Sequence, residues 1–224
     1  MITMDGPAGS GKSTAARGLA RKLGFLYLDT GAMYRAVALK AVRKKVSLGN
    51  AAALTQLASR AKIDFKGRGD RVRVFMDGLE VTRSIRHPEI SEAASRVAVV
   101  PGVRRALVRQ QRRIGRSGGV VAEGRDTGTV VFPRAPLKFF LTASLPERAR
   151  RRWRELKSSG HRVGLARVLR EARRRDVRDR SRKVAPLQAA PGAIRIDNTR
   201  LQSAQVLDIL MDYVHRAKTD VSYR

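Results

Sequence analysis

A glycine-rich segment near the start carries the most specific chemical signal in the chain. Gly6-Pro-Ala-Gly-Ser-Gly-Lys-Ser13 matches the pattern G-x-x-x-x-G-K-[ST] at every required position. Such a loop curls around a phosphate group with its backbone N–H groups pointing inward, and its lysine and hydroxyl serve the phosphates and a magnesium ion. We therefore expect a phosphorylated nucleotide to bind here. The predicted contact residues are Gly6, Pro7, Ala8, Gly9, Ser10, Gly11, Lys12, Ser13 and Thr14.

The order of the predicted elements places this loop in an α/β fold. Residues 1–4 form a short apolar stretch typical of a strand, and residues 12–23 carry apolar side chains at helical spacing up to Gly24, a common helix stop. A second strand over residues 25–28 leads into a second helix that continues to about residue 43. This alternation predicts a P-loop NTPase-type parallel sheet flanked by helices.

The middle of the chain departs from this alternation of strands and helices. Residues 71–76 alternate between polar and apolar side chains, and Asp77-Gly78 is a turn signal before residues 79–82. We therefore expect a small antiparallel β insert between about residues 63 and 82. The other expected elements are a helix over 91–114, strands over 119–123 and 137–141, a helical hairpin over 146–182 divided at 158–160, a strand over 193–196 and a helix over 201–217.

A second group of polar residues follows the second predicted strand. Asp29-Thr-Gly-Ala-Met-Tyr-Arg35 places a hydroxyl, an aromatic ring and an arginine after the strand's last residues. Ligands of doubly wound sheets bind outside the carboxyl ends of the strands, so we expect these side chains beside the phosphate loop. Taken alone, Tyr34 and Arg35 would equally suit an ordinary helix surface.

Five segments together resemble the bacterial cytidylate kinases, and the resemblance extends essentially from end to end. The segments are residues 6–14, 29–35, 93–98 with Val103-Arg104, 124–133, and 175–182 before Ala185-Pro-Leu. The run Gly124-Arg-Asp-Thr-Gly-Thr-Val-Val-Phe-Pro133 is highly specific for this family. The resemblance implies a nucleoside monophosphate kinase that uses ATP and Mg²⁺ to phosphorylate CMP and dCMP. It also implies that the β insert is the NMP-binding insert of the bacterial members.

The resemblance further implies a role for each residue on the acceptor side. The residues expected to face the cytosine ring are Ser95, Arg104 and Asp126. Those expected around the acceptor phosphate are Thr30, Tyr34, Arg35, Arg125 and Arg182, and those expected at the ribose hydroxyls are Arg175 and Asp179. The residue types suit these partners, because arginine binds phosphate oxygens in a fork and a carboxylate accepts from an amine or a hydroxyl.

Arginines on the predicted hairpin complete the expected catalytic machinery. Phosphoryl transfer needs in-line positioning and positive charge around the transferred group. Arg148, Arg151 and Arg152 are close in helical spacing, so one helix face can carry them as a lid that closes over ATP and excludes water. The predicted catalytic residues are Lys12, Arg125, Arg148, Arg151 and Arg182, and the predicted magnesium ligands are Ser13 and Glu123.

The composition of the 224 residues fits one intracellular enzyme domain. The chain contains no cysteine, which excludes disulfides and zinc–thiolate sites, and no apolar run approaches the roughly 20 residues of a membrane helix. We expect a single domain over residues 1–224 that acts as a monomer in the cytoplasm and not at a membrane. Within it, we expect the NMP-binding insert at 57–96 and the arginine-rich lid at 146–182.

The net charge of +29 leaves other interpretations open. It arises from 48 lysines and arginines against 19 acidic residues, and it would attract polyanions without regard to sequence. One alternative is therefore a basic, nucleic-acid-associated P-loop protein, although the chain shows no RNP sequence and no zinc finger. The other alternative is a P-loop kinase that acts on UMP, AMP or shikimate, which Gly124-Arg-Asp126 and the insert disfavour.

Overall fold

The computed structural model describes residues 1–67 and 72–221. The chain forms two compact units: the first contains Met1 and residues 20–124, and the second contains residues 2–19 and the chain from Arg125 onward. The predicted alternation at 71–76 falls partly outside the described residues, because Arg71 is not among them. The boundaries predicted for the single domain, the insert and the lid stay predictions.

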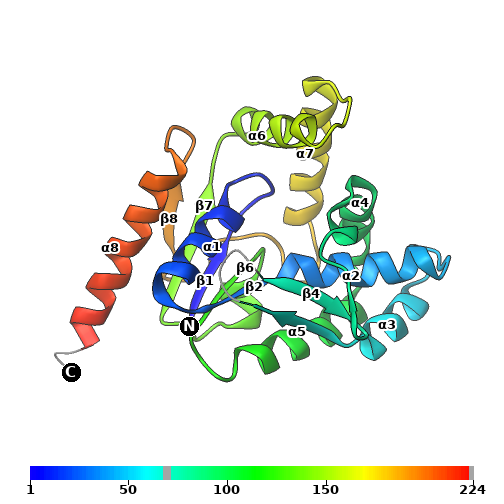
Figure 1. The fold of residues 1–224 in the computed structure, drawn as a ribbon, viewed down its shortest axis with the longest axis horizontal. Helices are drawn as coiled ribbons and strands as arrows, with labels where there is room; N and C mark the ends of the chain where they lie inside the picture. Colours follow the sequence, from blue (N-terminus) through cyan, green and yellow to red (C-terminus); the bar gives the residue numbers. More distant parts are fainter. Residues whose placement is uncertain (68–71, 222–224) are drawn as a thin grey trace. The chain divides into compact units, whose positions relative to one another are not determined.

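The second unit is built on three parallel strands (Figure 1). They are β1 (Ile2–Asp5), β7 (Leu137–Thr142) and β8 (Ile194–Asp197), with Met4 opposite Phe139 and Phe139 opposite Ile194. Its helices are α1 (Lys12–Leu23), which begins in this unit, α6 (Leu145–Ser158), α7 (Leu165–Arg180), α8 (Ser203–Val221) and the short π-helical segment η3 (Thr127–Val131). Helix α8 packs on the strands, with the Tyr213 ring edge-on to Phe139 at 6.1 Å between centroids.

The hairpin of α6 and α7 has a small apolar cluster of its own. Ala149, Leu156 and Val168 are buried in it, and the partly buried Trp153, Val163 and Leu169 pack against them. The indole N–H of Trp153 donates to the carbonyl of Val163 at 3.0 Å, which ties α6 to the connection between the two helices. The predicted division of the hairpin is confirmed, although the connection runs over 159–164 and not over the predicted 158–160.

The first unit holds two further parallel strands and a small antiparallel sheet. The parallel strands are β2 (Leu26–Asp29) and β6 (Val120–Gly124), with Asp29 opposite Glu123. The antiparallel sheet has the order β3 (Ile63–Lys66), β4 (Arg73–Met76) and β5 (Leu79–Glu80). The helices are α2 (Thr30–Arg43), α3 (Ala51–Arg60), α4 (Pro88–Val97), α5 (Pro101–Gly115) and the one-turn η2 (Ser84–Arg86).

The predicted fold class is confirmed: the chain contains parallel strands flanked by helices, and it also contains a separate small antiparallel sheet. The Asp77-Gly78 signal is confirmed as the turn between β4 and β5, where both residues have positive φ angles of 52° and 86°. Among the described residues, no helix combines the length and the apolar character that crossing a membrane requires.

One helix expected from the sequence is wrong, and another helix was not predicted. The single helix expected over 91–114 is wrong: α4 ends at Val97 and α5 begins at Pro101. Proline lacks the N–H that a continuous helix needs but is well suited to the first helical position, so it starts a new helix here. Sequence reasoning also assigned no helix to residues 51–60, where the Asn50 side chain caps α3 by accepting from the Ala53 N–H at 3.0 Å.

Candidate active site

The glycine-rich loop connects the end of β1 to the start of α1. Gly6 and Gly9 have φ angles of 153° and 74°, which side chains disfavour. A Cβ atom on Gly6 would lie 2.0 Å from the Leu141 carbonyl oxygen, and one on Gly9 would lie 2.9 Å from the carbonyl oxygen of Arg148. The loop backbone therefore lies against β7 and α6 more closely than any side chain would permit.

Lys12 folds back over the loop that precedes it. Its side chain is buried, and Nζ donates to the Pro7 carbonyl at 2.9 Å. The Ser10 hydroxyl is fully buried and has no hydrogen-bond partner among the described residues. The loop thus presents a lysine charge and the N-terminal end of α1 together, which is a favourable environment for an anion.

Arg148 of α6 joins the phosphate loop to both helices of the hairpin. It is only 4% exposed, and its guanidinium binds Asp176 of α7 through two hydrogen bonds of 3.1 and 2.6 Å. The same side chain donates to the Ala8 carbonyl of the loop at 3.1 Å and to the Ala143 carbonyl at 2.8 Å. These four hydrogen bonds use four of the five guanidinium N–H donors, so Arg148 fixes the hairpin to the loop.

Arg151 and Asn198 support the loop from its other end. Arg151 donates to both oxygen atoms of Asn198, at 3.0 Å to the side chain and 2.8 Å to the carbonyl. Asn198 in turn donates from its amide to the Ser10 carbonyl at 2.7 Å. Arg152 instead pairs with Glu155 at 2.8 Å. Sequence reasoning missed Asn198, and no motif in the sequence marks it.

A buried carboxylate organises the predicted acceptor arginines of the second unit. Asp179 is 1% exposed and accepts from Arg125 Nε at 2.9 Å and from the Arg182 guanidinium. Burial acts to raise the pKa of Asp179, but the charges of Arg125, Arg182 and Arg175 outweigh burial and hold the pKa below its usual range. Three arginines around one carboxylate leave a net positive charge, which suits a phosphate ligand.

Asp5 fixes the segment that follows Arg125 and Asp126. Its side chain is buried and accepts three hydrogen bonds of 2.8 Å, from the N–H and the hydroxyl of Thr127 and from the N–H of Gly128. Burial outweighs these hydrogen bonds and raises the pKa of Asp5 to about 6. Sequence reasoning missed Asp5, although a carboxylate directly before the glycine-rich loop was a visible signal.

In the first unit, Glu123 lies at the end of β6 with β2 beside it. It is 2% exposed, and one carboxylate oxygen accepts from the Tyr27 hydroxyl at 2.5 Å. The other oxygen, Oε2, is buried without a hydrogen-bond partner among the described residues. Thr30 donates from its hydroxyl to the Glu123 carbonyl at 2.8 Å.

Asp29 orients Arg35 on the first turns of α2. The Arg35 guanidinium donates to Asp29 at 2.6 Å, and the other Asp29 oxygen accepts from the Ala32 N–H at 2.8 Å as the helix cap. Burial acts to raise the pKa of Asp29, but the Arg35 charge and these hydrogen bonds lower it. Arg35 is therefore held in a defined position by an ionised carboxylate.

In the first unit, Arg104, which was predicted to face the base, contacts Tyr34, which was predicted to lie at the acceptor phosphate. The Arg104 guanidinium of α5 lies 5.5 Å from the ring centroid of Tyr34 of α2, a cation–π distance. Arg104 is 3% exposed and donates to the Ala98 carbonyl at 3.2 Å. Ser95 is also buried, on α4, which packs against α2.

A family model described as Cytidylate kinase matches residues 2–216. The chain belongs to the cytidylate kinase family. It is 47% identical over 217 residues to a cytidylate kinase of Desulforamulus reducens, with 97% of each chain covered. It is 49% identical over 210 residues to a cytidylate kinase of Desulfitobacterium hafniense, covering 94% of this chain and 90% of the relative.

Another cytidylate kinase relative is longer than this chain. A bifunctional pantoate ligase/cytidylate kinase of a Synechococcus strain is 48% identical over 217 residues, which is 95% of this chain and 40% of the relative. The cytidylate kinase family membership confirms the predicted family and the predicted enzyme class, a nucleoside monophosphate kinase.

Several residues predicted for the cytidylate kinase site lie together within each unit. The second unit joins the phosphate loop to Arg148 and Arg151, and it gathers Arg125, Arg175 and Arg182 around Asp179. The first unit brings Tyr34 to Arg104 and Thr30 to Glu123. The two predicted magnesium ligands divide between the units, with Ser13 in the second and Glu123 in the first. The roles of these residues toward ligands stay predictions.

Proposed function

We propose that the chain transfers the γ-phosphoryl group of ATP to CMP and dCMP, as a monomer in the cytoplasm. Its membership in the cytidylate kinase family supports the reaction. The observation that carries the proposal is the presence, within one unit, of two separate groups of cationic side chains. One is the glycine-rich loop with Lys12, and the other is the arginine cluster around Asp179. A kinase for nucleoside monophosphates needs both, because donor and acceptor each carry phosphate.

The acceptor base is assigned to Asp126, with Ser95 and Arg104 in supporting roles. Cytosine carries an exocyclic amine that donates to a carboxylate, whereas uracil carries a carbonyl oxygen at the same position. The Asp126 carboxylate would therefore attract the amine of cytosine and repel the carbonyl oxygen of uracil. Discrimination of this kind is worth a few kcal/mol, since a polar group left unpaired in a pocket is costly.

The proposed mechanism relies on positioning and charge. The acceptor phosphate is held by Arg125 and Arg182, whose geometry Asp179 fixes. One of its oxygens can then attack the γ-phosphorus in line while the bond from the γ-phosphorus to the ADP oxygen breaks. Arg148 and Arg151 connect the hairpin to the phosphate loop, and the hairpin excludes water that would otherwise accept the phosphoryl group.

A magnesium ion is part of the proposal. The described residues contain no cluster of three or more His, Asp or Glu side chains that could hold a metal by themselves, and magnesium in kinases is held largely by nucleotide phosphates. The unpartnered Oε2 of Glu123 and the Ser13 hydroxyl are chemically suited as its protein ligands. When bound, the ion neutralises charge on the phosphates.

The first test is an ADP-release assay with ATP and Mg²⁺ that compares CMP, dCMP, UMP, AMP and shikimate as acceptors. We expect CMP and dCMP to be phosphorylated at least about tenfold more efficiently than the others, because a few kcal/mol separates the bases. We expect EDTA to abolish turnover. Equal rates with UMP would refute the assignment of Asp126, and turnover that survives EDTA would refute the magnesium site.

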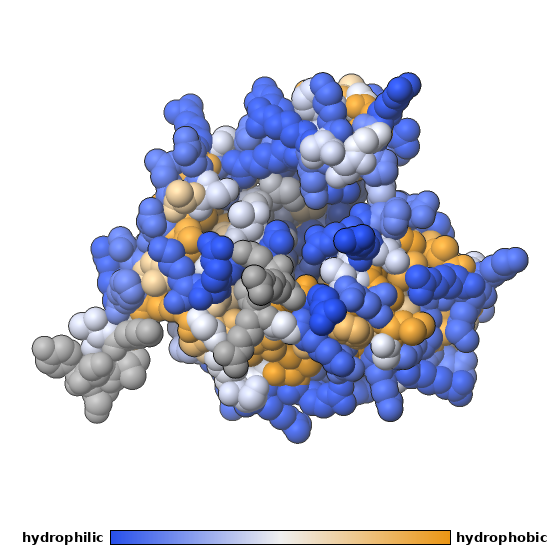
Figure 2. Space-filling model, viewed as in Figure 1, coloured by the Kyte–Doolittle hydropathy of each residue, from blue (hydrophilic) through white to orange (hydrophobic). Residues whose placement is uncertain are grey.

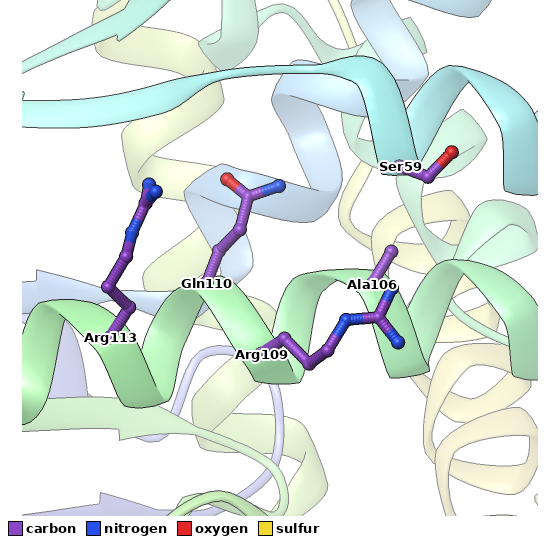
Figure 3. A pocket seen from close by; sticks show the side chains of 5 residues that line it. All are labelled: Ser59, Ala106, Arg109, Gln110 and Arg113. Atoms are coloured by element: carbon purple, nitrogen blue, oxygen red, sulfur yellow. The ribbon is translucent and has the colours of Figure 1, made fainter.

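A basic helix face supports a weaker proposal, non-specific binding of polyanions. Besides the buried Arg104, helix α5 carries arginines at 105, 109, 112 and 113 and no acidic residue. Arg109 and Arg113 line a hollow with Ser59, Ala106 and Gln110 (Figure 3). The Gln110 amide is engaged, since it donates to the Ala61 carbonyl at 2.9 Å. Figure 2 shows hydrophilic side chains over much of the surface that it draws, without distinguishing basic from acidic ones.

We expect binding to single-stranded DNA that weakens steeply with salt and ignores base sequence. Replacing Arg109 and Arg113 by alanine should reduce the slope of log affinity against log salt by about 1 to 2, because each released phosphate contact contributes about 0.7 to 0.9. The matched control removes two exposed charges elsewhere, Arg43→Ala with Lys44→Ala. An equal reduction in the control would show that α5 is not the binding face.

A further inference from the structure

Asp5 connects the two halves of the proposed reaction site that lie in the second unit. It is the last residue of β1, directly before the phosphate loop, and it binds the segment directly after Asp126. We propose that Asp5 is a positioning residue for acceptor specificity, which holds Asp126 where it can read the base. This inference rests on the proposed function, because it assumes that Asp126 contacts cytosine.

Both carboxylate oxygens of Asp5 take part in holding the segment. Oδ1 accepts from the N–H and from the hydroxyl of Thr127, and Oδ2 accepts from the N–H of Gly128, all at 2.8 Å. A Cβ atom on Gly128 would lie 2.9 Å from the Thr3 hydroxyl oxygen and 3.4 Å from Asp5 Oδ2. The backbone after Asp126 is therefore pressed against β1 at the strand's final residues.

The segment held by Asp5 has an unusual backbone path. Residues 127–131 form a π-helical turn in which the Asp126 carbonyl accepts from the N–H groups of Val130 at 2.9 Å and Val131 at 3.2 Å. The Thr127 carbonyl accepts from Phe132 at 2.7 Å. Isolated π-helical turns are rare and occur frequently at functional sites, where specific contacts keep them in place. Asp5 supplies such contacts at the first two residues of the turn.

An ionised carboxylate suits this arrangement, because each of its oxygens can accept from the donors that face it. Three donors converge on Asp5, whereas an asparagine in the same place would turn an NH₂ group toward either Thr127 or Gly128. Burial and the nearby charge of Asp126 both oppose ionisation, and together they raise the pKa of Asp5 to about 6. An acid kept in such an unfavourable position is better explained by a task in the site than by stability alone.

The test is the Asp5→Asn variant, assayed at neutral pH for kcat and KM with CMP, with UMP and with ATP. We expect the ratio of kcat/KM for CMP to that for UMP to fall about tenfold or more, because Asp126 is no longer held in place. We expect the KM for ATP to change by less than about threefold, since no loop contact with the nucleotide is removed. Circular dichroism and thermal unfolding check that the variant is folded.

Two further variants keep the inference falsifiable if Asp5→Asn does not fold. Thr127→Val removes one of the three donors and should lower the CMP-to-UMP ratio in the same direction, by about two- to fivefold. Thr3→Val is the matched control: its hydroxyl is buried on the same strand but has no hydrogen-bond partner among the described residues, so the ratio should not change.

The outcomes separate the inference from the proposed function. A wild-type protein that does not prefer CMP to UMP overturns the proposed function, and the inference falls with it. A selective wild type whose Asp5→Asn and Thr127→Val variants lose CMP and UMP activity by the same factor overturns the inference alone. In that case Asp5 contributes to folding and not to the reading of the base.

Discussion

Replacing Lys12 by alanine lowers kcat by a factor of about 10³ or more in the ADP-release assay, because charge stabilisation dominates phosphoryl transfer. In the structure, Lys12 Nζ lies over the loop and donates a hydrogen bond to the Pro7 carbonyl oxygen, 2.9 Å away. With ATP bound, the same ammonium group can move to the β- and γ-phosphates. Alanine removes that charge from a buried position beside the loop.

The matched control is Lys22→Ala, on the same helix but exposed in its last turn. It should leave kcat within about twofold of the wild type, since an exposed lysine is strongly screened. Equal losses in the two variants would mean that the loop lysine acts only through the fold. A thermal unfolding measurement on each variant distinguishes lost chemistry from lost structure.

The largest expected effect on stability belongs to Asp179→Ala. This change removes the acceptor shared by Arg125 and Arg182, whose side chains are 17% and 6% exposed, and leaves both cations without that partner. Removing one partner of a buried ion pair costs about 3 to 5 kcal/mol. The free energy of unfolding, measured in urea, should therefore be lower by about 3 to 5 kcal/mol than that of the wild type. The kcat/KM for CMP should fall as well, because the two arginines lose their orientation.

The control on the same helix is Glu171→Ala. Glu171 pairs with Arg167 at 2.9 Å, but both side chains are more than half exposed. Exposed pairs contribute about 0 to 1 kcal/mol, so the free energy of unfolding of this variant should stay close to that of the wild type. Similar losses in both variants would show that the Asp179 cluster is no more than a surface ion pair.

The pH dependence of the Asp179 effect has a definite sign. The pKa of Asp179 is lower in the folded protein than in the unfolded chain, so its ionisation stabilises the fold above the unfolded value of about 3.9. This contribution is lost as pH falls through the lower folded pKa. The stability difference between wild type and Asp179→Ala should therefore be constant near neutrality and shrink only in strong acid.

Local signals predicted a large part of this fold. The phosphate loop was predictable because its glycines, lysine and serine all lie within eight residues, and the Asp77-Gly78 turn because two adjacent residues dictate its geometry. The break between α4 and α5 was also marked in the sequence, by Pro101. That signal was outweighed by the apolar periodicity on either side of it.

The contacts that arrange the site were beyond sequence reasoning. Asp5 and Thr127 are 122 residues apart, and Asn198 and Ser10 are 188 residues apart, so neither pair forms a recognisable spacing. Arg148 was predictable as a cationic residue of the hairpin, but its bidentate pairing with Asp176 depends on how two helices pack. Residue types were thus easier to predict than the partners that fix their positions.

The hairpin of α6 and α7 contains the only tryptophan of the chain, Trp153. Its indole ring packs on the hairpin's own apolar cluster, and the Lys157 ammonium lies 5.3 Å from the ring centroid. Excitation at a wavelength that tryptophan alone absorbs therefore yields intrinsic emission that originates from this hairpin alone. Emission recorded while ATP or CMP is titrated therefore reports on the hairpin directly, without a dye and without a change to the sequence.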